Sequence, residues 1–209
     1  MKKLILTIII GVFFTGFVSA QTNYLPGFQA GIKAGADYSL FPSPDGAHNK
    51  GQFGYIGGGW ARIGGAGLFF QPELYAVSKS LTVTQLADDN LFINHGTFTN
   101  IDVPLLVGNK VGNVNAGFRF YTGPVISFAI AKRQSFTNAT LTSDLNYHDM
   151  NYAWQLGVGA DLKQFSFDVR YEAGINKVPY GTSTTLHTRL NTVNITLSYS
   201  LFSDYGSGE

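Results

Sequence analysis

The feature that most constrains this chain is strict alternation of side-chain character, and residues 165–174, FSFDVRYEAG, show it most clearly. One set of alternate positions is aromatic or small and apolar: Phe165, Phe167, Val169, Tyr171 and Ala173. The other set carries three charges, on Asp168, Arg170 and Glu172. Because side chains of a β-strand point alternately to opposite faces, this segment predicts a strand with one apolar face and one charged face.

Similar segments recur along the chain, while long helical patterns are missing. Seven further segments with a period of two lie at residues 28–38, 52–63, 67–79, 99–108, 113–130, 151–162 and 188–202. Most are near the ~9–11 residues that a tilted strand needs to cross a bilayer. The sequence therefore predicts eight strands.

The links between these segments alternate in length. Tight links follow the second, fourth and sixth segments, at residues 64–66, 109–112 and Lys163-Gln164. Long links rich in Asn, Asp, Ser, Thr, Pro and Gly follow the others, at residues 39–51, 80–98, 131–150 and 175–187. Short turns on one side and long loops on the other are typical of an outer-membrane barrel.

The N-terminus indicates export. Lys2 and Lys3 precede an apolar run, and Val18-Ser19-Ala20 is a small-residue cleavage site. We expect residues 1–20 to be a cleaved signal peptide and residues 21–209 to form one barrel domain. The alternative is an uncleaved anchor, but the apolar run of about 15 residues is shorter than the ~20 that a spanning helix needs.

Composition excludes several functions. Charged residues make up 13% of the chain, about half the ~25% of a soluble domain. Loss of two lysines with the signal peptide leaves 12 basic residues against 13 acidic ones, a balance that does not suggest nucleic-acid binding. Cysteine is absent, so there can be no disulfide and no thiolate metal site.

Alternation alone also fits a secreted soluble β-sandwich. Three features favour lipid instead: the polar faces carry few long lysines, aromatic residues crowd the apolar faces, and signal peptide and loop lengths fit an outer membrane. We predict an all-β, eight-stranded antiparallel up-and-down transmembrane barrel with short periplasmic turns and four long extracellular loops. Its aromatic girdle would contain Tyr38, Trp60, Phe128, Tyr152, Trp154, Tyr171 and Tyr199.

The charged faces must then point inward, into a lumen that side chains of an eight-stranded barrel can fill. The predicted lumen network contains Lys33, Asp37, Arg62, Glu73, Lys79, Asp102, Arg119, Asp161, Asp168, Arg170 and Glu172. Buried charges persist when they are paired and hydrogen-bonded, and the signs here nearly balance. We therefore expect a closed lumen, whereas a selective pore would show an excess of one sign.

The order of these motifs resembles the PorT-like outer-membrane β-barrel family of Bacteroidetes. The resemblance rests on residues 31–35 (GIKAG), Gln71 to Tyr75, Val103 to Leu106 and Arg170 to Gly174, and it extends over nearly the whole mature chain. Val103 and Ile175 depart from the residues usual in that family, and the tail SDYGSGE follows Phe202. The resemblance implies an eight-stranded outer-membrane barrel, and one family member is linked to protease secretion.

Other functions have weaker support. His48, His95, His148 and His187 are the candidate general bases, and all fall in or beside the predicted loops. They lack a nucleophile motif, so we predict no enzyme, no cofactor and no catalytic or metal site. We expect a monomer with a structural, adhesion or docking role. Its partners would be outer-membrane lipid and lipopolysaccharide, the barrel assembly machinery and an envelope or secretion partner, with a narrow pore or a lipid-modifying enzyme as alternatives.

Overall fold

The computed structural model describes the segments that form strands and some of their links. These are residues 27–40, 53–65, 67–87, 90–113, 116–136, 150–175, 178–180, 186–188 and 191–204. The expected signal peptide lies outside the described residues. Within them, there is no helix with the length and apolarity needed to cross a membrane.

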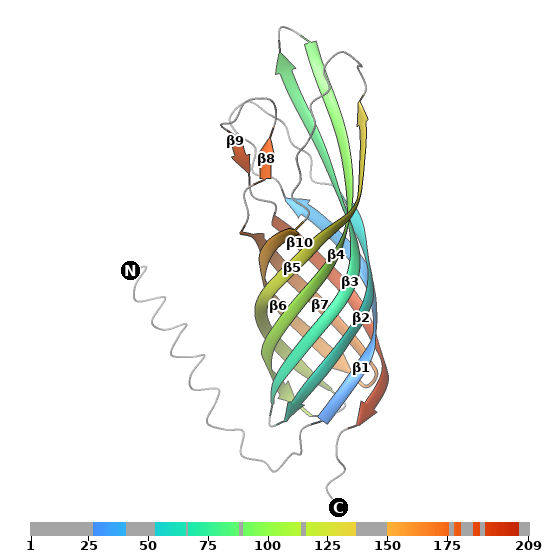
Figure 1. Ribbon diagram of the computed structural model, residues 1–209. Coiled ribbons are helices and arrows are strands. Elements are labelled where there is room, and N and C mark those ends of the chain that lie inside the picture. The colour runs from blue at the N-terminus through green and yellow to red at the C-terminus, as the bar shows by residue number, and fades with distance from the viewer. Residues whose placement is uncertain are drawn as a thin grey trace, which may run out of the picture.

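Eight strands form a closed antiparallel barrel in the order β1-β10-β7-β6-β5-β4-β3-β2 (Figure 1). They are β1 (Gly27–Leu40), β2 (Phe53–Gly65), β3 (Leu68–Ala87), β4 (Asn90–Gly112), β5 (Ala116–Phe136), β6 (Met150–Leu162), β7 (Phe165–Gly174) and β10 (Asn191–Asp204). Each strand pairs with its neighbour in the chain, and β1 pairs with β10 to close the cylinder. A separate hairpin, β8 (Val178–Tyr180) and β9 (Leu186–Thr188), lies between β7 and β10 in sequence. The predicted all-β, eight-stranded antiparallel barrel is confirmed.

Alternation sets which side of the wall each residue faces. In β7, Ser166, Asp168, Arg170 and Glu172 are buried, whereas the residues between them are exposed. The barrel wall separates an outer apolar surface from an inner polar one, as the period of two predicts. A register slip of one residue would carry the charges to the outer face, so the pattern fixes the register.

Tight turns lie at one end of the barrel, where β1 also begins and β10 ends. Phe28 of β1 pairs there with Asp204 of β10. Gly67 and Lys163, which lie in turns, and Gly112, the last residue of β4, adopt positive φ angles of 84°, 54° and 132°. Residues 109–112, predicted as a turn, instead belong to β4 and pair with β5, so this turn comes later in the chain.

Three neighbouring strands are much longer than the rest. β3, β4 and β5 have 20, 23 and 21 residues, against 10 to 14 in the other five strands of the barrel. Their extra length projects beyond the barrel end opposite the tight turns (Figure 1). We call this projection the arm and define it as Ser78–Ala87, Asn90–Thr99 and Ala129–Phe136.

The arm corrects one prediction. Residues 80–98 were expected to be a long loop, but Ser80–Ala87 pairs with Asn90–Thr97 as a continued hairpin. The alternating Leu, Thr and Val residues at 81–84 satisfy strand geometry, and their Thr content resembles loop composition. Residues 131–136 likewise extend β5. The other predicted long loops fall largely outside the described residues.

A β-bulge lies where the arm leaves the barrel. Asn100 pairs with Ala129, but Thr99 pairs with Ala131, so Ile130 is an extra residue in β5. The pairing of β5 with β6 ends just before this point, at Phe128 and Met150. Because a bulge bends its strand and increases the local twist, β5 bends where it enters the arm.

Candidate functional site

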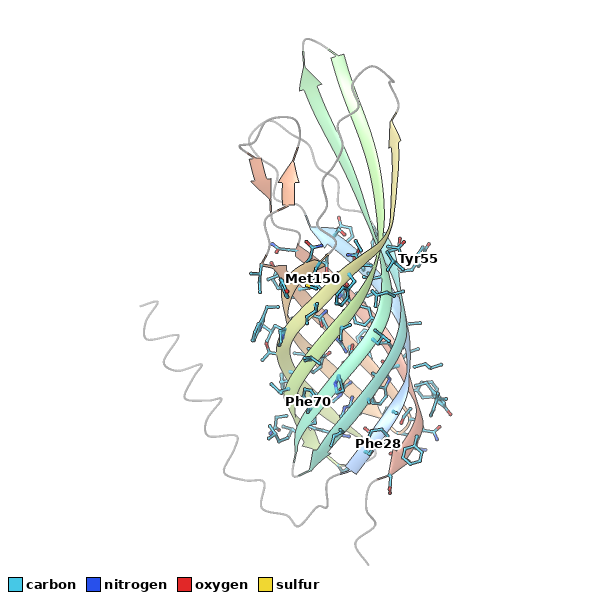
Figure 2. The ribbon with its side chains drawn as sticks, in the orientation of Figure 1. Phe28, Tyr55, Phe70 and Met150 are labelled. Carbon is cyan, nitrogen blue, oxygen red and sulfur yellow. The ribbon has the colours of Figure 1, made fainter. Side chains whose placement is uncertain are left out.

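The outer face of the barrel is a band of exposed apolar side chains. Figure 2 shows Tyr55 and Met150 near the arm and Phe28 and Phe70 near the tight turns, all on the outer surface. Aromatic pairs lie near both borders of the band: the Tyr38 and Phe53 ring centroids are 4.9 Å apart, and those of Phe28 and Phe202 are 5.8 Å apart. Such exposure would be unfavourable in water and suits lipid.

Six of the seven residues predicted for the girdle lie on this outer face. Phe128, Tyr152, Trp154 and Tyr171 are exposed, and Tyr38 and Tyr199 are partly exposed. Trp154 donates a hydrogen bond from Nε1 to Thr122 Oγ1 at 2.7 Å, which satisfies its polar group on the lipid side.

Trp60 is the exception, because it lies inside the barrel. Only 5% of its surface is exposed, and its Nε1 donates to the carbonyl oxygen of Ile32 at 3.2 Å. The Arg62 guanidinium lies 5.0 Å from the Trp60 ring centroid. Glycines surround Trp60 and obscure the alternation, but the charge at Arg62, two residues later, indicates the inward face.

The lumen holds a first charge cluster around Asp161, near the tight turns. Arg119 Nε and Arg62 Nη1 lie 2.8 and 3.2 Å from its carboxylate oxygens, and Lys110 Nζ lies at 3.1 Å. Ser166 Oγ donates to the same carboxylate at 2.7 Å. Lys110 was missed from sequence because residues 109–112 read as a turn, although its alternate spacing from Asp102 places it on the inward set.

A second cluster surrounds Glu73, farther along the lumen. Arg170 binds it with two nitrogens, at 2.7 and 2.8 Å, and Lys33 Nζ lies at 2.6 Å. Gln71 Nε2 donates a further hydrogen bond at 2.6 Å. The Glu73 carboxylate is therefore fully coordinated by donors, as a buried charge requires.

Asp168 and Tyr121 connect the two clusters. Asp168 lies 3.0 Å from Arg119 Nη2 of the first cluster and accepts a hydrogen bond from Tyr121 OH at 2.6 Å. Arg170 Nε of the second cluster donates to the same Tyr121 oxygen at 2.9 Å. The lumen thus contains one continuous network, whose members come from β1 through β7 and cross-link opposite walls.

The remaining predicted lumen acids lie nearer the arm. Asp37 accepts a hydrogen bond from Ser39 Oγ at 3.2 Å, and Asp102 accepts one from Ser127 Oγ. Glu172 accepts from Gln155 Nε2 at 2.8 Å. All three are buried. The side chain of Lys79, the one other predicted member, lies outside the described residues.

Apolar side chains fill part of the lumen as well. Phe69, Leu106 and Tyr121 form one buried cluster, and Ile56, Tyr75 and Val77 form another. Leu106 and Val125 are completely buried, as is Arg119 among the charged residues. Salt bridges and apolar packing together close the lumen.

Metal binding has no support in the part of the chain that is described. No group of three or more His, Asp or Glu side chains there could hold a metal ion. His48 and His148 lie outside the described residues, whereas His95 lies in the arm strand β4 and His187 in β9. The buried carboxylates are occupied by cations, amides and hydroxyls.

A family model described as "Outer membrane protein beta-barrel domain" matches residues 19–179, which is most of the chain. The chain belongs to this family. Its closed eight-stranded barrel and lipid-facing band agree with that assignment. The protein is therefore a small integral barrel of the bacterial outer membrane with a charge-filled, closed lumen.

Solved structures with similar shape are distant in sequence. Ail, the attachment invasion locus protein of Yersinia pestis, is 11% identical, with a TM-score of 0.43 over 85% of this chain and 100% of that one. Neisserial surface protein A is 13% identical, with a TM-score of 0.39 over 83% and 97%. A search of curated proteins finds no match.

Proposed function

We propose that this barrel is a non-enzymatic membrane anchor that presents its arm to a protein partner in the envelope or outside the cell. The arm carries this proposal, because three strands continue beyond the lipid-facing band as a sheet without flanking strands in the described residues. A sheet with free edges can accept an extended segment of another chain as an added strand.

We propose that this contact is made at the β5 edge of the arm. Pairing with β6 ends at Phe128, so Ala129–Phe136 has a strand neighbour only on its β4 side within the described residues. This segment contains Lys132 and Arg133 and no acidic residue. We therefore propose that the partner contributes an extended segment with acidic side chains, which would favour association electrostatically.

The backbone geometry identifies a variant that would block this edge. Hydrogen-bonded and non-hydrogen-bonded pairs alternate along an antiparallel ladder. In the β4–β5 ladder, this alternation makes Thr99 and Ala131 one hydrogen-bonded pair, and Thr97 and Arg133 another. Alternation then points the N–H of Gln134 away from β4, toward the free edge. Gln134→Pro removes this donor and leaves the hydrogen bonds between β4 and β5 intact. Gln134→Ala is the matched control.

Capture experiments on cells, with a crosslinker that acts on the arm, would test the proposal. We expect Gln134→Pro to lose the captured partner and Gln134→Ala to retain it, while both variants keep normal heat-modifiability on gels. If the proline variant captures as much partner as the wild type, edge pairing is wrong.

A conducting pore is the second candidate, and the packed lumen argues against it. Single-channel recording in planar bilayers should show no steady conductance for the wild-type protein. Steady conductance well above background would contradict the closed lumen.

We also propose that the loop histidines have no enzymatic role. The observation behind this is that His95 and His187 belong to different elements, the arm strand β4 and the β8–β9 hairpin. Lipid profiles of cells should not change when all four histidines are replaced by alanine. A changed profile would favour a lipid-modifying enzyme.

We also propose that this chain is a PorT-like barrel of Bacteroidetes. It is supported by the order of the motifs in β1, β3, β4 and β7. On this view the protein is a monomer in contact with lipopolysaccharide. The assembly machinery inserts it, and its envelope partner belongs to a secretion system. Co-purification from the native membrane would test these contacts.

A further inference from the structure

Three prolines lie in neighbouring strands in the middle of the barrel wall. Pro72 is in β3, Pro104 in β4 and Pro124 in β5. They lie close together in the register, because Pro72 pairs with Leu105, next to Pro104, and Pro104 pairs with Val125, next to Pro124. Proline is unusual in a central strand, since it cannot donate a hydrogen bond to the ladder.

Each proline coincides with a gap in the ladder on the side of the preceding strand. In the β2–β3 seam, pairing stops after Trp60↔Glu73 and resumes at Ile63↔Phe70. The β3–β4 and β4–β5 seams have equivalent gaps beside Pro104 and Pro124. The register is the same on both sides of each gap, so these are missing bonds and not slips.

The missing pairs identify the carbonyl groups involved. In an antiparallel ladder, a bonded pair exchanges two N–H···O=C bonds. The absent pairs Ala61/Pro72, Glu73/Pro104 and Leu105/Pro124 each lack the bond that proline would donate. The carbonyl oxygens of Ala61, Glu73 and Leu105 therefore face proline nitrogens, which have no hydrogen.

The other five seams of the barrel have no such gap. The β5–β6, β6–β7, β7–β10 and β1–β2 ladders are continuous, and the β1–β10 ladder contains one bulge, at Ala30/Gly31. Because an unpaired backbone group is costly in lipid, three omissions in adjacent seams weaken one side of the wall selectively.

We propose that Pro72, Pro104 and Pro124 mark a line of weakened strand pairing, which we call the compliance line. Along it, the strands β2 to β5 can move slightly relative to one another while their register is kept. The same three strands continue into the arm, so small movements along this line allow the arm to tilt. The continuous ladders of the opposite wall hold the rest of the barrel fixed. The compliance line does not depend on whether the arm binds a partner.

Amide hydrogen exchange of the whole protein in lipid nanodiscs would test this proposal, without any partner present. We expect the amides of Ala61, Glu73 and Leu105 to exchange at least about tenfold faster than those of Val158 and Val169 in the continuous β6–β7 seam. Equal exchange rates in the two seams would overturn the proposal.

Restoring one of the missing hydrogen-bond donors provides the second part of the test. Pro124→Ala adds an N–H on an exposed, lipid-facing residue and should slow exchange at Leu105 by about tenfold. Val158→Ala, which also shortens a lipid-facing side chain but adds no donor, is the control. This test needs only the single change Pro124→Ala. Unchanged exchange at Leu105 would contradict the compliance line.

The movement of the arm can be measured directly, because the chain contains no cysteine. Spin labels introduced at Thr84 in the arm and at Leu156 on β6 should give a broad distance distribution. The triple variant with alanine at all three prolines should narrow it. If it folds and the distribution stays as broad, the prolines do not control the tilt.

Discussion

The barrel has two unlike walls. From β6 through β7 and β10 to β1, the ladders are continuous or carry one bulge, and the inner face is polar, with residues such as Asp168, Arg170 and Thr196. From β2 to β5, three ladders are interrupted at prolines, and the inner face includes the apolar Leu106 and Val125. The strands of the regular wall end at the end of the barrel, whereas β3, β4 and β5 of the interrupted wall continue into the arm.

The difference shows how two kinds of stabilisation are distributed in one cylinder. The regular wall relies on backbone hydrogen bonds, and it shares the salt bridges of the lumen with the other wall. The interrupted wall gives up some backbone bonds and gains apolar packing inside the lumen. The Glu73 carboxylate, on β3, ties the two together through Lys33 and Arg170.

Glu73→Ala should therefore have the largest effect on this division. It leaves the ammonium of Lys33 and the guanidinium of Arg170 buried without their shared acceptor, which costs about 3–5 kcal/mol of unfolding free energy. Urea titration in lipid vesicles, followed by heat-modifiability, measures the loss. Leu74→Ala, on the lipid face beside it, is the control, and an equal loss in both variants would show that the tie between the walls is weak.

Leu106→Ala would test the apolar packing of the interrupted wall. The side chain is completely buried against Phe69 and Tyr121, so its truncation leaves a cavity and costs about 2–5 kcal/mol. Val107→Ala, the next residue on the lipid face, should cost much less in the same urea titration. If the two variants lose similar stability, the inner packing contributes little.

A proline placed in the regular wall would show whether the walls tolerate missing donors differently. Val158→Pro removes a ladder bond in a seam with no interruption and should cost about 1–3 kcal/mol beyond the loss for Val158→Ala. Thermal conversion between the folded and unfolded gel bands provides the measurement. Equal stability of the two variants would mean that the regular ladder does not support its wall.

The turns provide the smallest contrast. In the interrupted wall, the positive φ angles belong to glycines, Gly67 in a turn and Gly112 at the end of β4. In the β6–β7 turn of the regular wall, Lys163 has a φ angle of 54°. Lys163→Gly should raise the unfolding free energy by about 0.5–1 kcal/mol, because glycine adopts this conformation without a steric penalty. Lys163→Ala is the control in the same titration and should bring no gain; a loss with glycine would contradict the expected strain.

Most of the barrel could be predicted from sequence because a period of two is a local signal. FSFDVRYEAG assigns its own inner and outer faces, and the charged residues of the other strands do the same. The prediction failed where that signal was weak or misleading. Trp60 lies among glycines, and residues 80–98 have the Thr and Asn content of a loop but pair as strands.

The partners within the lumen could not be predicted from sequence. Arg170 and Glu73 are 97 residues apart in the chain, and only closure of the sheet with its stagger brings them together. Lys110 joined the Asp161 cluster by the same closure. Which cation meets which carboxylate is a property of the cylinder's geometry, not of any single strand.

The sequence by itself determined that this chain forms strands with one face for lipid and one for ions, because alternation is set by local backbone geometry. The tertiary structure decided which ions pair, how far β3 to β5 extend, and that three prolines, distant in the chain, lie together in one part of the wall. These outcomes depend on the register between strands, and the register is fixed only when all eight close around a shared interior.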